Sequence, residues 1–256
     1  MIKLQSLKKA TTCFVCLVIP SIFLPTILQL LGHKVAQDAR IGFSIILVDR
    51  LFMDSGARIG HFSIVRLKRV LLRKGAYFGH MNFFKGPFSM ALSRRAGIGN
   101  RNVVTRARYG VSYGHASLVL GELSKITAGH KIDCMNSVLI GDNCTLAGTG
   151  TQVWTHGYVH ADSGPERYRI DGRVQIGNNV NIGSRSIITG GVMIADEIMV
   201  GVGTTVSKTL SNPGFYVSGE LRLLPKPTNP ESRSNLEWIE TSHVIENVYR
   251  KRDAHF

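Results

Sequence analysis

The sequence predicts an all-β protein folded as a parallel β-helix, a solenoid of hexapeptide repeats. The first observation is an aliphatic residue at every sixth position in the second half of the chain. The second is a small residue, most often glycine, directly after many of these aliphatics. A fixed hexad period is typical of a β-helix rather than of a single helix or strand. The unbroken series is Ile176, Ile182, Ile188, Ile194, Val200 and Val206.

A triangular coil explains the period of six, because each of three flat sides takes one hexad and eighteen residues complete one turn. The aliphatic residue of each side points inward and stacks on its counterpart one turn later. Each fully buried aliphatic contributes about 1.5–3 kcal/mol, so the stacked columns stabilise the fold. The 256 residues, 44% of them apolar, suffice for such a core. The predicted stacks are Ile176 on Ile194, Ile182 on Val200 and Ile188 on Val206.

The same spacing occurs earlier in the chain, so we predict one continuous solenoid over residues 35–211. The N-terminal series is Val35, Ile41, Leu47, Met53, Ile59, Val65, Leu71, Tyr77 and Phe83. After a stretch in which only Ile98 resembles a hexad start, the series continues with Leu120, Ile126, Ile132, Ile140 and Leu146. A two-residue slip between Ile132 and Ile140 predicts a bulge near Asn136.

Residues 1–34 form a separate segment, predicted to be helical and membrane-associated. Residues 12–31 contain no charged side chain, which is long enough to cross a bilayer as one helix. Pro20 and Pro25 interrupt this run, so a bent segment that enters the membrane and returns is the second interpretation. A helix packed on the protein's own core, covering one end of the solenoid, is the third. Residues 212–256 form a C-terminal extension, with a short amphipathic helix expected over residues 236–251.

Charge is unevenly distributed along the chain. Residues 1–108 contain 18 basic and 3 acidic residues, whereas residues 109–256 contain 13 and 14. A basic half predicts an anionic partner surface, with a solvated basic face as the alternative. The cysteines lack the spacing of a zinc site, so no metal is expected and no oxidising compartment is required. They are Cys13, Cys16, Cys134 and Cys144.

One segment breaks the hexad pattern, namely "WTHGYVHADSGPERYR" at residues 154–169. Loops that leave a rigid scaffold often carry function, which makes this loop the candidate active site. His156 lies at its root, and imidazole suits a general base because it titrates near pH 6.5. His160 and His130 are further candidates for a catalytic role. Asp162 and Glu166 are candidates for orienting an imidazole.

The run from "THGYVH" to "IGNNVNIGSRSIITGGVMIADEIMVGVGTTVSKTL" resembles the hexapeptide-repeat acyltransferase superfamily, in particular O-acetyltransferases of polysaccharide biosynthesis. The resemblance is good over residues 120–211. It implies a left-handed β-helix, a homotrimer, acetyl-CoA as co-substrate, and a loop histidine that deprotonates the acceptor hydroxyl. That role corresponds to His156. Direct transfer needs no acyl-enzyme.

The resemblance also implies which residues contact the donor. The donor positions are Ser184, Gly201, Val202, Ser207 and Lys208, of which Lys208 suits a phosphate as a mobile cation. Corner glycines such as Gly201 are also required by the fold itself. For the acceptor, we expect contacts from Asp133, Trp154 and Tyr158.

The sequence therefore predicts an acetyl-CoA-dependent O-acetyltransferase of a glycan or lipid-linked sugar in cell-envelope polysaccharide biosynthesis. Its expected place is the cytoplasmic face of the inner membrane, peripheral or re-entrant, with no nucleic-acid partner. Three alternatives stay open: an N-acyltransferase of a nucleotide sugar or small acceptor, a zinc lyase resembling γ-carbonic anhydrase, and a non-catalytic membrane-bound scaffold. The zinc lyase would use His130, His156 and His160 as ligands.

Overall fold

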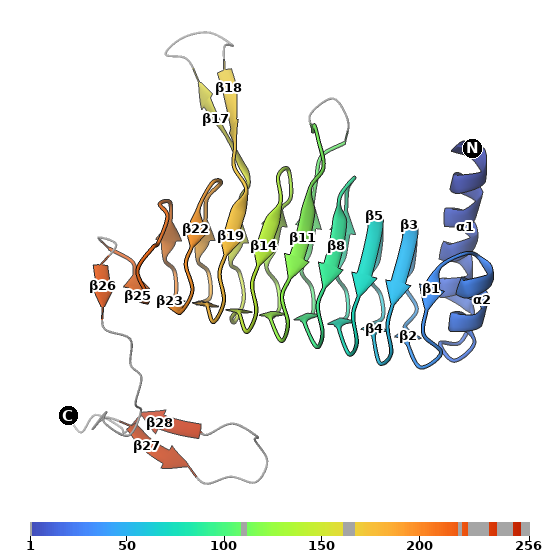
Figure 1. The fold of residues 1–256 in the computed structure, drawn as a ribbon, viewed down its shortest axis with the longest axis horizontal. Coiled ribbons are helices and arrows are strands. Elements are labelled where there is room, and N and C mark those ends of the chain that lie inside the picture. Colours follow the sequence, from blue (N-terminus) through green and yellow to red (C-terminus); the bar gives the residue numbers. More distant parts are fainter. Residues whose placement is uncertain are drawn as a thin grey trace. The chain divides into compact units, whose positions relative to one another are not determined.

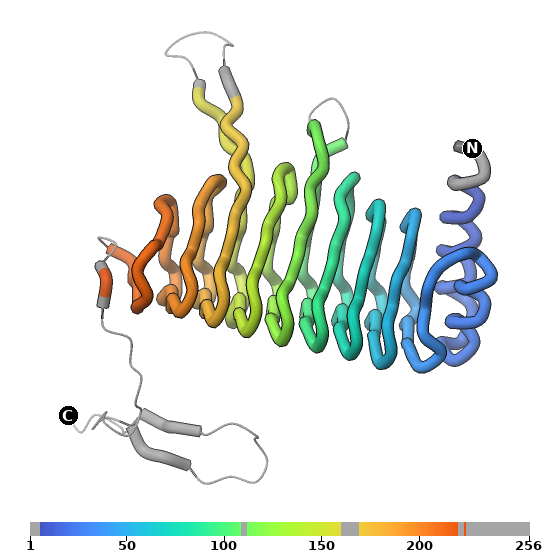
Figure 2. Tube along the Cα trace, viewed as in Figure 1, coloured from blue at the N-terminus to red at the C-terminus, as the bar shows by residue number. Residues whose placement is uncertain are grey.

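A computed structural model of the chain describes residues 2–108, 112–160, 167–219, 222–224, 236–239 and 248–251. The chain divides into two compact units, residues 1–223 and residues 224–256. The first unit is a parallel β-solenoid whose successive coils stack along one axis (Figures 1 and 2). The predicted β-helix is therefore confirmed.

Each coil contributes short strands to three faces. Face 1 is a 10-stranded sheet of β2 (Arg40–Ile41), β4 (Arg58–Ile59), β6 (Tyr77–Phe78), β9 (Gly97–Ile98), β12 (Lys125–Ile126), β15 (Thr145–Leu146), β20 (Asn181–Ile182), β23 (Ile198–Val200), β25 (Gly214–Val217) and β26 (Arg222–Leu224). Face 2 consists of β7 (Phe83–Lys85), β10 (Val103–Thr105), β13 (Lys131–Asp133), β16 (Gln152–Val153), β21 (Ile187–Ile188) and β24 (Thr205–Val206). Face 3 consists of β1 (Lys34–Val35), β8 (Ser89–Leu92), β11 (Ser117–Leu120), β14 (Val138–Ile140), β19 (Val174–Ile176) and β22 (Met193–Ile194). Two nine-residue strands, β3 (Ile45–Met53) and β5 (Ile64–Leu72), run through both face 2 and face 3.

The hexad aliphatics of the C-terminal half stack as predicted. Ile176 pairs with Ile194, Ile182 with Val200 and Ile188 with Val206. All six are buried at 4% exposure or less. The triangular interpretation of the period of six is correct here.

At four positions of the N-terminal hexads, the residue predicted to point inward is one position away from the residue that is buried in the structure. The residues expected inside are Leu47, Leu71, Tyr77 and Phe83, whereas the residues that fill the core are Ile46, Leu72, Phe78 and Phe84. These coils are longer than eighteen residues: Ile59 pairs with Phe78, nineteen positions later. Because side chains alternate along a strand, a slip of one residue turns each side chain to the opposite face.

Buried polar side chains form a ladder along the corner between faces 1 and 2. At each step, the backbone N–H of one coil donates to the polar side chain of the coil before it, over 2.9–3.2 Å. The ladder satisfies backbone donors that the sharp corner leaves without a strand partner. Its members are Ser44, Ser63, Asn82, Asn102 and His130, and it ends at the N–H of Thr151.

The chain leaves the solenoid twice at the corner between faces 2 and 3. The first excursion connects β10 to β11, and the second is the antiparallel hairpin of β17 (His156–His160) and β18 (Arg167–Asp171). Both project from the same side of the solenoid (Figure 1). One coil, containing β13 and β14, lies between the two coils that carry them.

The N-terminal segment is a helical cap on one end of the solenoid, as the third sequence interpretation proposed. Helix α1 (Ile2–Val18) ends before Pro20, and α2 (Leu24–Leu30) begins with Pro25 in its first turn. Both helices lie at one end of the solenoid (Figure 1). Their residues Cys16, Leu24 and Leu28 are buried in the core. The expected membrane-spanning or re-entrant segment over residues 12–31 is therefore corrected. Within the described residues, neither helix has the length and hydropathy that crossing a bilayer requires.

A buried histidine links this cap to the first coil. His33 Nδ1 accepts the backbone N–H of Leu51 at 3.2 Å, and its Nε2 lies 3.0 Å from the Thr12 hydroxyl of α1. Burial, and secondarily the charge of Lys8, lowers the pKa of His33 to about 4. His33 is therefore neutral at pH 7 and donates from Nε2 to Thr12.

The C-terminal residues differ from the sequence prediction. Strand β25 extends face 1 beyond residue 211, where the solenoid was expected to end. In the second unit, β27 (Leu236–Ile239) and β28 (Val248–Lys251) pair as antiparallel strands. The expected amphipathic helix over residues 236–251 is therefore wrong at both ends, because residues 236–239 and 248–251 form strands.

Candidate functional site

The candidate site lies at the root of the β17–β18 hairpin, where His156 meets Asp133 of the preceding coil. His156 Nδ1 lies 2.9 Å from Asp133 Oδ2. The same carboxylate oxygen accepts the backbone N–H of Thr155 at 3.1 Å and the Thr155 hydroxyl at 2.6 Å. That hydroxyl in turn accepts the backbone N–H of Asn136 at 2.9 Å. Thr155 thus holds the Asp133 carboxylate in place beside the imidazole, and Asn136 holds the Thr155 hydroxyl.

This geometry determines the tautomer of His156. An ionised carboxylate can only accept hydrogen bonds, so the proton of the imidazole lies on Nδ1. No residue in the described part of the chain forms a hydrogen bond with Nε2, so its lone pair can accept a proton. Because the His156 side chain is 23% exposed and that of Asp133 is 10% exposed, the base faces solvent while its partner is covered. The pair has the arrangement of a general base held by an orienting acid.

The hairpin begins and ends where two coils approach very closely. Gly172 donates its N–H to the carbonyl of Thr155 at 2.9 Å, which closes the hairpin. A Cβ on Gly172 would lie 2.2 Å from the backbone N of Gly191 in the next coil. Only glycine fits this contact. Gly172 therefore allows the hairpin to leave the solenoid without displacing His156.

Further contacts hold the hairpin against the first excursion. Arg169 pairs with Asp171 at 2.7 Å on β18, and the Arg169 guanidinium lies 5.6 Å from the Tyr113 ring. The hydrogen bond from Tyr113 to Asp171 raises the pKa of the Tyr113 phenol. On β17, the Tyr158 ring stands edge-on to the His156 ring at 5.9 Å. The contacts between the two excursions thus fix the position of the hairpin beside His156.

The three predicted histidines are not brought together. His130 is 1% exposed and belongs to the corner ladder: Nδ1 accepts the N–H of Thr151, and Nε2 bonds to the Thr127 hydroxyl. Burial lowers its pKa, so it is a neutral wall residue, and its predicted catalytic role is corrected. His160 ends β17, four residues beyond His156, which places its backbone about 13 Å away.

The predicted acceptor residues take different positions. Asp133, for which an acceptor contact is expected, lies beside His156 and orients its ring. Trp154 directly follows β16, donates from Nε1 to Gln152 at 3.1 Å and lies below the Lys131 ammonium at 5.1 Å. Tyr158 is 42% exposed beside His156. In the sequence, Trp154 precedes His156 by two residues and Tyr158 follows it by two. Asp162 and Glu166 lie outside the described residues.

The predicted donor residues lie at the two edges of face 2. Ser184, Gly201 and Val202 follow β20 and β23 at the corner shared with face 1, and Val202 is 71% exposed. Ser207 and Lys208 follow β24 at the corner shared with face 3, which is also the corner of the hairpin. The two corners are separated by the length of one short strand of face 2. These positions therefore flank the C-terminal part of face 2, beyond the coil of His156.

Three of the four cysteines are buried. Burial raises the pKa of Cys16 to about 12 and also raises that of Cys134 and Cys144. These thiols are poor nucleophiles at neutral pH. Within the described ranges, no three His, Cys, Asp or Glu side chains lie together as a metal site would require.

Comparisons with known proteins agree with this fold. Residues 173–208 match the sequence pattern of a family described as the hexapeptide repeat of succinyl-transferase. YvoF of Bacillus subtilis (strain 168), which is named for a proposed acetyltransferase activity, is 33% identical over 87 residues, covering 34% of this chain and 46% of YvoF. The chain thus spans about half the length of this curated relative.

Two solved structures extend the comparison. The polysialic acid O-acetyltransferase OatWY is 18% identical and has a TM-score of 0.50, over 76% of this chain and 84% of its own. A maltose O-acetyltransferase from Clostridium difficile 630 is 26% identical and has a TM-score of 0.40, over 50% of this chain and 66% of its own. The likeness to OatWY is a likeness of fold.

Sequence analysis missed the link between Asp133 and His156. The two are 23 residues apart, and "TH" in the loop root gives no indication of its partner. Tyr113 was missed for the same reason, since its contacts with the hairpin join separate excursions. A useful signal was the pair of interruptions in the hexad pattern, which here occur at one corner.

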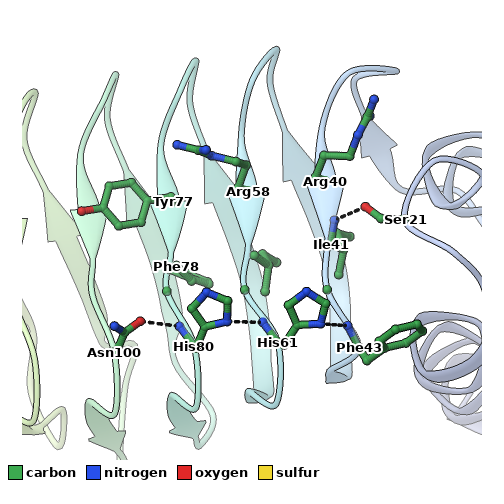
Figure 3. A pocket seen from close by; sticks show the side chains of 14 residues that line it. Ser21, Arg40, Ile41, Phe43, Arg58, His61, Tyr77, Phe78, His80 and Asn100 are labelled. Carbon is green, nitrogen blue, oxygen red and sulfur yellow. Dashed lines mark hydrogen bonds between the residues drawn. The ribbon is translucent and has the colours of Figure 1, made fainter.

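A concavity of about 540 Å³ lies on face 1, in the coils next to the cap (Figure 3). His61 and His80 stack with their rings 5.6 Å apart, and each accepts a backbone N–H from the preceding coil through Nδ1. Arg58 and Tyr77 form the opposite edge. This concavity faces away from the corner that carries His156.

Proposed function

We propose that this hexapeptide-repeat protein is an acetyl-CoA-dependent O-acetyltransferase acting on a saccharide hydroxyl. The observation that carries the proposal is the Asp133–His156 pair at the root of a hairpin leaving the coil. The pair supplies a partly exposed imidazole whose Nε2 can accept a proton, which is what deprotonation of a hydroxyl requires. The hexapeptide repeats and the named activity of YvoF support the acyl-transfer chemistry.

The proposed reaction is a direct transfer. Nε2 of His156 takes the proton of the acceptor hydroxyl as its oxygen attacks the thioester carbonyl of acetyl-CoA. The tetrahedral intermediate expels the CoA thiolate, which takes the proton back from Nε2 and leaves as a thiol. Asp133 stabilises the transient imidazolium through Nδ1–H and keeps the ring in the productive orientation. Neither Cys134 nor Cys144 needs to be acylated.

The donor is proposed to lie along the C-terminal part of face 2. Ser184, Gly201 and Val202 would contact the pantetheine arm, and Ser207 and Lys208 the nucleotide end. A homotrimer would complete the site by placing a neighbouring solenoid across this groove. Light scattering on the purified 28.1 kDa chain tests the trimer.

We further propose that the protein works in cell-envelope polysaccharide biosynthesis, with its cap against the cytoplasmic face of the inner membrane. The outer surface of the cap supports this peripheral contact, because its large apolar residues are 43–83% exposed. Basic residues of α1 and the first coils would add attraction to anionic lipids, at about 1 kcal/mol each. The exposed apolar residues are Leu7, Phe14, Leu17, Val18, Ile22, Phe23 and Leu30.

The test is release of CoA from acetyl-CoA in the presence of neutral, acidic and amino sugars. We expect acceptor-dependent release by the wild type, product mass increased by one acetyl group, and a loss of about 10²–10⁴-fold in His156→Gln. The exposed His115 serves as a matched control, so His115→Gln should keep wild-type turnover. Turnover by His156→Gln equal to that of the wild type contradicts the proposal, and transfer only to amines replaces O-acetylation by N-acylation.

A further inference from the structure

A strongly basic groove lies between the cap and the candidate site. Its volume is about 820 Å³, and it is bounded by α1, β3, β5, β7 and the start of the first excursion. Asp49 is the sole acidic residue among its described lining residues, and it pairs with Lys9 of α1. We call this the basic groove; its charged residues are Lys9, Asp49, Arg66, Lys68, Lys85, Arg106 and Arg108.

The basic groove is aligned with the candidate site by the register of face 2. Arg66 pairs with Lys85, Lys85 with Thr105, and Thr105 with Asp133, so these four residues occupy one row across neighbouring strands. Strands are spaced by about 4.8 Å, which places Lys85 about 10 Å and Arg66 about 14 Å from Asp133. An extended ligand lying along this row would reach both His156 and the basic side chains.

A buried cation lies where the groove approaches the site. Arg106 is 5% exposed, and its guanidinium donates to the carbonyls of Pro87 and Tyr113 at 2.9 and 2.6 Å. Its Nε is buried without a hydrogen-bond partner among the described residues. Carbonyl oxygens are neutral, so they leave the positive charge of Arg106 uncompensated, and a nearby anion would be stabilised by it.

We propose that the basic groove binds the anionic groups of an acidic oligosaccharide acceptor, at basic residues whose strand positions lie about 10–14 Å from that of Asp133. This inference rests on the proposed saccharide transfer and specifies its substrate class. A carboxylate- or phosphate-bearing sugar fits because Arg66 and Lys85 are exposed donors on one straight row, with Arg106 behind them. Neutral sugars would gain nothing from this charge.

The direct experiment measures binding, so it does not depend on acetyl transfer. Fluorescence anisotropy is recorded with a fluorescein-labelled hexamer of galacturonic acid and with labelled maltohexaose as the neutral probe of equal length. We expect the acidic hexamer to bind, maltohexaose to bind at least about tenfold more weakly, and added salt to reduce the difference. Arg66→Glu and Lys85→Glu should each weaken acidic binding by about tenfold or more.

The matched control is Arg58→Glu, which makes the same charge change in the same coil but in the concavity of Figure 3. It should retain wild-type binding. Equal binding of the two probes, or a loss in Arg58→Glu and not in Arg66→Glu, overturns the proposal. So does binding to phosphatidylglycerol vesicles without binding to the acidic hexamer. If the hexamer binds as expected but no sugar is acetylated, the proposed function fails while the groove assignment stands.

Discussion

Asp133→Asn is the substitution that isolates the role of the orienting carboxylate. It keeps the size of the side chain and removes its charge. In the native protein Oδ2 receives three donors, from His156 Nδ1 at 2.9 Å and from the N–H and hydroxyl of Thr155 at 3.1 and 2.6 Å. When the amide NH2 group takes the place of Oδ2, it faces Nδ1 of His156, and both bonds from Thr155 are lost.

The amide NH2 would donate to Nδ1 and move the imidazole proton to Nε2, the atom that must accept the acceptor's proton. We therefore expect kcat to fall by about 10²–10⁴-fold. The KM for acetyl-CoA should change little, because the proposed donor residues lie in later coils. Breaking the bonds to Thr155 should lower the free energy of unfolding by about 1–3 kcal/mol.

Steady-state CoA release and urea unfolding measure these two quantities. The control is Asp142→Asn, at an exposed corner of the solenoid, where the carboxylate accepts a backbone N–H of Glu122 at 2.5 Å. It should keep wild-type kcat. The reasoning is refuted if Asp133→Asn keeps kcat within threefold of the wild type while its fold is intact.

Three further predictions concern the cap, the hairpin and the thiols. Because the pKa of His33 falls from 6.5 to about 4 on folding, the free energy of unfolding should be highest above pH 6.5 and decline by up to about 3 kcal/mol as the pH drops to 4. In urea titrations, His33→Gln should flatten this pH dependence. An unchanged pH dependence in His33→Gln would rule out His33 as its source. Gly172→Ala should lower stability by about 1–3 kcal/mol and reduce kcat, because its Cβ would lie 2.2 Å from a backbone atom. Gly157→Ala, whose Cβ would have no atom within 4 Å, should change neither quantity in thermal melts and turnover assays. Equal effects of the two substitutions would contradict this explanation. Cys134 and Cys144 should resist iodoacetamide at pH 8, read by peptide mass spectrometry, since burial raises the pKa of both; rapid labelling of either in the folded protein would contradict this.

The repeat itself was predictable where the hexads are regular. From Ile176 onward an eighteen-residue coil follows directly from the spacing, and the stacked pairs agree with the structure. In the N-terminal half, aliphatic residues occur on both faces of the long strands β3 and β5. The sequence alone cannot separate Leu47 from Ile46 there, because both are apolar and only the coil length decides which is inside.

The ends of the chain were less predictable because apolar content does not specify the apolar environment. Residues 12–31 look like a membrane segment by hydropathy, yet Cys16, Leu24 and Leu28 are buried in the core that the cap shares with the first coil. At the site, His156 was recognisable from its place at the loop root. Its partner Asp133 was not, since their contact depends on the number of residues in the intervening coil.

The central claim is that His156 carries its proton on Nδ1 and presents a free Nε2. Two-dimensional ¹H–¹⁵N NMR of ¹⁵N-histidine-labelled protein at pH 8, with His156 assigned from the spectrum of His156→Gln, measures the tautomer directly. We predict a protonated Nδ1 in the wild type and loss of that state in Asp133→Asn. A wild-type spectrum with the His156 proton on Nε2 would contradict the proposed base.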